Sequence, residues 1–200
     1  EREEHVLKFL HTTNMVENSM FNISETLSAP AYWGTDASFT DEVFMLGPNF
    51  SYYGDYAAGI KLGPTPGWLS TNTIPLDESE PITASWHARI PTDMGLTGVT
   101  GHYAIKWLDD RNDPTSDTDV VGTFHVSETG YSRFYLSMGY SDDLVSEDTY
   151  DKFGIPVVKT QEFMNIPSGV ANFQLMLSGD LNSSLSPESF MAVDAVQVEN

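Results

Sequence analysis

The chain has 200 residues, of which 29 are Asp or Glu and only 9 are Lys or Arg, so its formal net charge is −20. A chain with this net negative charge is not expected to bind nucleic acid or an anionic membrane. It has no cysteine for disulfides, thiolate metal sites or nucleophiles, and no apolar run of about 18 residues for membrane insertion.

Residues 1–13 and 14–200 differ in pattern. The first segment mixes charged and apolar residues without a clear period, and we predict that it is a connecting arm. From residue 14 onward, short apolar runs are broken by Gly, Pro, Asn and Asp, which is typical of an all-β chain. The length suits one domain with a single sizeable core.

We predict ten strands along the domain. In chain order they are 15–21, 42–46, 58–62, 82–90, 103–108, 121–126, 133–138, 161–165, 170–177 and 190–199. In most of them apolar and polar residues alternate, as in strands that bury one face. Two antiparallel sheets packed face to face in a jelly roll follow from this pattern. The predicted core residues are Trp86, Trp107, Phe134, Leu136, Phe173 and Leu175.

Two long polar loops interrupt the strands. The segment 109–119 holds five Asp residues but lacks the Gly and the final Glu of an EF-hand loop, so a solvated connection is favoured. The segment 141–159 is long for a hairpin, and long loops on a sandwich are common places for binding or subunit contacts.

Motifs for catalysis are absent from the sequence. It contains no nucleophile elbow, no H-E-x-x-H, no P-loop and no G-x-G-x-x-G. The five histidines show no spacing typical of a metal site. We therefore predict a protein without enzymatic activity.

Several positive and hydrogen-bonding side chains fall on the polar sides of the central strands. If these strands are neighbours, their side chains form a locally basic, ligand-facing sheet surface. Ordinary cross-strand pairing with nearby acids is the alternative. The predicted ligand-binding residues are His87, Arg89, His102, Lys106, Arg133 and Tyr135, with His125 beside them.

Sugar binding also requires aromatic rings on which a pyranose can stack. Tyr52, Tyr53, Tyr56 and Trp68 lie in or beside the Gly- and Pro-rich stretch 47–67 and are the candidates for this role. The same rings could instead pack the loop itself or form a subunit contact.

The closing strand 190–199 carries one acid, Asp194, at its centre. Read with period two, Asp194 shares a face with Val196 and Val198, in line with core residues. An uncompensated buried charge is costly. Asp194 must therefore reach water at the sheet edge, accept backbone N–H bonds, or bind a cation.

The ending Val193-Asp194-Ala195-Val196-Gln197-Val198-Glu199 resembles the closing strand of carbohydrate-binding-module-like jelly rolls. Such domains occur beside secreted glycoside hydrolases and inside bacteriophage tail and capsid proteins. Further similar stretches follow the family's order, at 14–22, 31–33, 82–89 and 163–170.

The resemblance implies a non-catalytic structural module of a phage virion, in a tail, a fibre or a capsid decoration. On the virion surface it would contact other virion proteins or a cell-surface glycan, and a homotrimer is one expected state. The alternative is a carbohydrate-binding module of a secreted polysaccharide-degrading enzyme. A third interpretation is a lectin or decoration subunit that assembles through its loops and binds no glycan.

The resemblance also implies a structural calcium ion between the first and last strands. Asp194 stands at the position of the closing-strand ligand, but Asn22 occupies a position that is usually an acid. Asn22 could still ligate through its amide oxygen, with Glu17 as a substitute charge.

Overall fold

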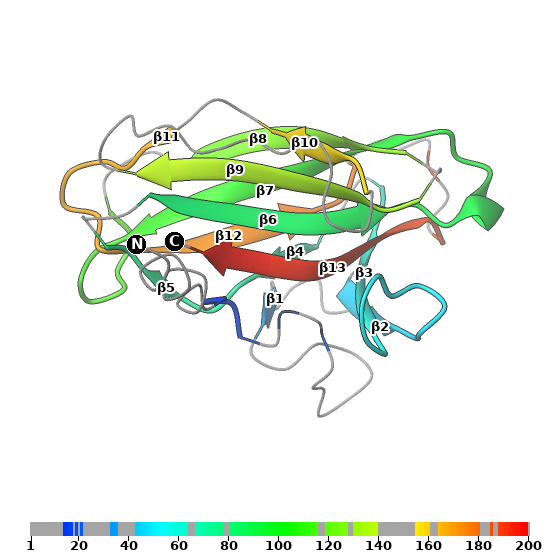
Figure 1. Ribbon diagram of the computed structural model, residues 1–200, viewed down its shortest axis with the longest axis horizontal. Coiled ribbons are helices and arrows are strands. Elements are labelled where there is room, and N and C mark those ends of the chain that lie inside the picture. The colour runs from blue at the N-terminus through cyan, green and yellow to red at the C-terminus, as the bar shows by residue number, and fades with distance from the viewer. Residues whose placement is uncertain are drawn as a thin grey trace, which may run out of the picture.

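A computed structural model of the chain describes residues 14–17, 19, 21, 33–35, 43–63, 67–77, 81–115, 119–127, 130–139, 155–160, 164–180, 185 and 188–199. Within these residues, thirteen strands form two sheets, and one short 3₁₀ turn, η1 (Thr92–Met94), joins β6 to β7. The sheets lie one over the other as two layers (Figure 1). The predicted all-β sandwich is confirmed.

The six-stranded sheet has the order β1-β4-β12-β7-β8, and β5 also pairs with β12. Its ladders are antiparallel. The strands are β1 (Gly34–Thr35), β4 (Trp68–Ser70), β5 (Ile74–Pro75), β7 (Val99–Leu108), β8 (Val120–Val126) and β12 (Asn172–Ser178).

The seven-stranded sheet has the order β10-β9-β6-β13-β3-β2, and β11 also pairs with β9. Its long ladders are antiparallel, whereas the short β10 and β11 run parallel to β9. The strands are β2 (Val43–Leu46), β3 (Ala57–Lys61), β6 (Ile82–Arg89), β9 (Ser132–Gly139), β10 (Val157–Lys159), β11 (Met164–Asn165) and β13 (Phe190–Glu199).

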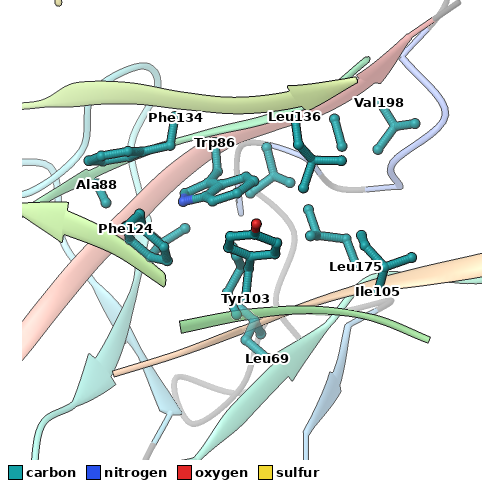
Figure 2. Packing of buried hydrophobic residues seen from close by; sticks show 14 of the residues in the cluster. Leu69, Trp86, Ala88, Tyr103, Ile105, Phe124, Phe134, Leu136, Leu175 and Val198 are labelled. Atoms are coloured by element: carbon teal, nitrogen blue, oxygen red, sulfur yellow. The ribbon is translucent and has the colours of Figure 1, made fainter. Parts of the chain in front are cut away.

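The space between the sheets is filled by the inward side chains of both. Trp86 of β6 lies at its centre, with ring centroids 5.6 Å from Tyr103 and 5.2 Å from Phe124 (Figure 2). All six predicted core residues are at most 1% exposed. Alternation therefore predicted the inward faces correctly.

A β-bulge in β13 overturns one prediction about facing. The pairing of β13 with β6 shifts register between Asp194 and Gln197, and Ala195 has a φ of 45°. The extra residue reverses the alternation, so Val193 and Val196 both point into the core. Asp194 thus lies on the opposite face from Val196, and the predicted shared face is wrong.

The observed strands also differ from the predicted ones in number and bounds. β7 begins at Val99 instead of residue 103, and β1, β4, β5 and β10 were not predicted. The described residues of 15–21 form no strand; instead, Met15 N donates to Val198 O at 2.9 Å along the edge of β13.

The predicted arm 1–13, the stretch 141–154 and residues 31–32 lie outside the described residues. The domain limits 1–13 and 14–200 stay a prediction. In the part that is described, no helix has the length and apolar character that a membrane span requires.

Candidate functional site

The six predicted ligand-binding residues do not form one surface. His87 and Arg89 lie on β6, and Arg133 and Tyr135 on β9, in the seven-stranded sheet. His102 and Lys106 lie on β7, which belongs to the six-stranded sheet. The predicted grouping is wrong, because the chain crosses from one layer to the other between β6 and β7.

The outer side of the seven-stranded sheet, here called the covered face, lies beneath the loop 47–56. Arg89 holds this loop: its Nη2 donates to Asn49 O at 2.6 Å, and its guanidinium lies 5.8 Å from the Phe50 ring centroid. The Tyr131 hydroxyl donates to Phe50 O. Burial, and then the nearby Asp194 charge, raise the pKa of Tyr131 above its ordinary 10, so the hydroxyl remains a donor.

Asp194 holds the same loop from β13. Its Oδ2 accepts the backbone N–H groups of Tyr52 at 2.7 Å and Tyr53 at 3.0 Å, and its Oδ1 accepts that of Ala195 at 2.7 Å. The carboxyl is completely buried. Burial raises the pKa of Asp194 from 3.8 to about 6, although the three N–H bonds act in the opposite direction.

The remaining predicted residues of this sheet also have contacts within it. His87 is 4% exposed, and its ring stacks on Tyr52 with centroids 4.1 Å apart. Arg133 Nη2 donates to Ser85 Oγ at 3.0 Å, and Tyr135 is buried. Within the covered face, His87 therefore packs against the loop, and Arg133 is bound to the neighbouring strand β6.

We expect Arg89→Ala to lower stability, contrary to the binding role that the sequence suggested. The change removes one charge-assisted hydrogen bond and two ring contacts. The free energy of unfolding should fall by about 2 kcal/mol, as measured by urea unfolding. Arg111→Ala, with the same charge change at an exposed residue, is the control. Equal stability of both variants would contradict a structural role for Arg89.

The four predicted aromatic residues are also separated. Tyr52 stacks on His87, Tyr56 packs against the main core, and Tyr53 is 54% exposed at the loop. Trp68 lies on β4, in the other sheet. A single aromatic platform does not form.

The outer side of the six-stranded sheet, here called the open face, brings Trp68 and His102 into one row. Leu69 and Tyr103 point into the core, so their neighbours Trp68 and His102 point outward. Trp68 pairs with Ser178, and Ser178 pairs with His102. Two strand spacings therefore separate the Trp68 and His102 backbones, about 10 Å.

Lys106 lies on the same face, four residues along β7 from His102, or about 13 Å. Its cross-strand neighbour is Gln174 of β12. Trp68, His102 and Lys106 are all half-buried, and within the described residues none of their side chains makes a hydrogen bond, ion pair or ring contact. In this part of the chain, their side-chain polar groups therefore have no competing protein partner.

Sequence reasoning missed other members of the open face. Met176 pairs with both Ser70 and Ala104, in the row next to that of Trp68. Val121 extends this row on β8 and is 64% exposed. Alternation did place Met176 and Gln174 on a polar side, but their lack of charge gave no reason to choose them.

Calcium binding by Asp194, Glu17 and Asn22 stays a prediction. Asn22 lies outside the described residues, and Glu17 is exposed. Both oxygens of Asp194 already accept N–H bonds. Among the residues that the structure places, no group of three or more His, Cys, Asp or Glu is arranged to hold a metal. Asp194 is thus seen in the hydrogen-bonded state, one of the three that the sequence allowed.

The two packed sheets form a jelly roll. Solved structures of carbohydrate-binding modules have the same fold. No protein-family model matches the sequence, and a search of curated proteins finds no match. The similarity between this chain and the solved structures is therefore a similarity of fold.

Three solved structures illustrate it. The carbohydrate-binding module TmCBM61, in complex with β-1,4-galactotriose, has a TM-score of 0.51 and 11% identity, over 93% of this chain and 97% of that one. The xylan-binding domain CBM22-1 of Paenibacillus barcinonensis Xyn10C has a TM-score of 0.52 and 11% identity, over 90% of each chain. Tailspike protein 4 of bacteriophage CBA120 has a TM-score of 0.54 and 14% identity, over 92% of this chain but 21% of its own.

Proposed function

We propose that the chain is a non-catalytic carbohydrate-binding module whose open face binds a glycan. One observation carries the proposal: the side chains of Trp68, His102 and Lys106 lie on one outer sheet face, and within the described residues none of them makes a hydrogen bond, ion pair or ring contact. On the covered face, in contrast, Arg89 and Asp194 hold the loop 47–56.

The chemistry of these side chains suits sugar recognition. A part-exposed indole offers an apolar face for the C–H surface of a pyranose, together with an N–H donor. Lys106 and Gln174 can donate to sugar hydroxyls, and His102 can donate or accept. A few directed polar groups around an aromatic surface are typical of small-molecule sites.

Two biological contexts are proposed for such a module. The tailspike likeness supports a virion component at the particle surface, in a tail, fibre or decoration, with other virion proteins as partners and a homotrimer as one expected assembly. The likeness to xylan- and galactotriose-binding modules supports a module of a secreted polysaccharide-degrading enzyme to a similar degree. The proposed glycan-binding role of the open face is the same in both contexts.

A glycan array probed with the labelled full chain tests the proposal. We expect binding to a small set of related glycans, with no new reducing ends after prolonged incubation with the preferred one. Binding to no glycan on a broad array would contradict the proposed function. Release of reducing ends would contradict its non-catalytic character.

A further inference from the structure

The longest terminal strand in the described part of either sheet is β8, with seven residues at one end of the six-stranded sheet. The other terminal strands, β1, β2 and β10, have two, four and three residues. A terminal strand leaves a row of backbone N–H and C=O groups without partners, to which another strand can add. Within the described residues, only the β7 ladder makes hydrogen bonds to β8.

The composition of β8 does not block such pairing. Protein edges are usually protected by charged residues, by proline or by shortness, but the sequence Val-Val-Gly-Thr-Phe-His-Val has neither a formal charge nor proline. Its outward residues Val121, Thr123 and His125 are exposed. Among the described residues, the edge is thus long and neutral, and its outward side chains are exposed.

We propose that β8 pairs antiparallel with β8 of a second copy of the chain, which joins two six-stranded sheets into one. The strand is self-complementary about its central residue, as a twofold interface requires. Thr123 then faces Thr123 of the second copy, and Val121 faces its His125. Cross-strand pairs of β-branched residues are favourable. Asp119, next to the strand, faces Ser127 of the second copy, so no two carboxylates face each other.

The charge of the chain sets how this association depends on salt. Each copy carries −20, so two copies repel each other at low ionic strength. Salt screens this repulsion while the backbone pairing is preserved. The dimer should therefore strengthen as salt is added. The proposed dimer does not depend on whether the open face binds sugar.

Sedimentation velocity of the full chain tests the proposal. A seven-residue ladder is a small interface, so the dimer should populate between about 10 µM and about 1 mM protein. Its share should rise from about 0.02 M to about 0.5 M salt. A chain that stays monomeric over this whole range would overturn the proposal.

Variants of Thr123 distinguish β8 from other contacts. Thr123→Lys places two ammonium groups opposite each other and should weaken association at least about tenfold, although it lowers the overall repulsion. Val158→Lys, the same charge change on the exposed edge strand β10, is the control and should associate like the native chain. Thermal melting checks that both variants fold, as expected for exposed positions.

Charge complementation gives the sharpest outcome. Thr123→Glu alone should also associate more weakly than the native chain, whereas an equimolar mixture of Thr123→Lys and Thr123→Glu should form the dimer, because Lys then faces Glu. Association of Thr123→Lys at the native level, or loss of association in Val158→Lys, would place the interface elsewhere and overturn the proposal.

Discussion

Replacement of Trp86 by Ala should lower the free energy of unfolding by about 3 to 5 kcal/mol, the usual loss for a large buried aromatic residue. The Trp86 side chain is completely buried between the two sheets. Its ring contacts come from both layers, with Phe134 in its own sheet and with Tyr103 and Phe124 in the other (Figure 2). Urea unfolding with a fitted midpoint and slope measures the loss.

Trp86→Phe is the matched variant, because the indole N–H is buried and has no hydrogen-bond partner among the residues that the structure describes. Phenylalanine keeps most of the ring contacts and removes the unsatisfied donor, which itself costs about 1 to 3 kcal/mol. We therefore expect Trp86→Phe to lose less than about 1.5 kcal/mol. A near-neutral Trp86→Ala would place Trp86 outside the core, and equal losses in both variants would contradict the account of its N–H.

The second large effect concerns Asp194 and pH. The folded pKa of Asp194, about 6, lies above the ordinary value of 3.8. Its stabilising contribution is therefore fully present below about pH 4 and is lost as pH rises through about 6. Two pKa units correspond to a change of about 3 kcal/mol across this window.

Asp194→Ala isolates this contribution. The variant leaves three backbone N–H groups without their acceptor, so it should be less stable than the native chain. Its deficit should shrink as pH rises from 4 to 7, as measured by urea unfolding at several pH values. A deficit that grows with pH would mean that the N–H bonds outweigh desolvation and hold the pKa of Asp194 low.

Outside the bulged strand β13, alternation in the sequence predicted which residues of the long strands point inward, because both sheets share one core and only one face of each strand reaches it. Trp86 and Phe173 are examples, one from each sheet. Strand ends were less predictable where turns are short. The three-residue strand β4 follows a Gly- and Pro-rich stretch of sequence and has too few residues for a period to show.

The sequence could not predict which outward residues share a surface. That depends on the sheet that each strand joins, and pairings such as β7 with β12 link residues far apart in the chain. The bulge was equally hidden, since Ala195 is not the glycine that usually marks a positive φ. Sheet pairing separated Arg89 from His102 and Lys106, which share the open face with Trp68, and the bulge placed Asp194 on the covered face.

The measurement that tests the open face most directly is calorimetric titration of the preferred array glycan into two variants that each lose one aromatic ring. Trp68 lies on the open face, and Tyr53 is exposed at the loop over the covered face. We expect Trp68→Ala to bind at least about tenfold more weakly and Tyr53→Ala to bind like the native chain, with both variants folded by thermal melting. Loss of binding in Tyr53→Ala with native affinity in Trp68→Ala would contradict the assignment of the open face as the glycan-binding surface.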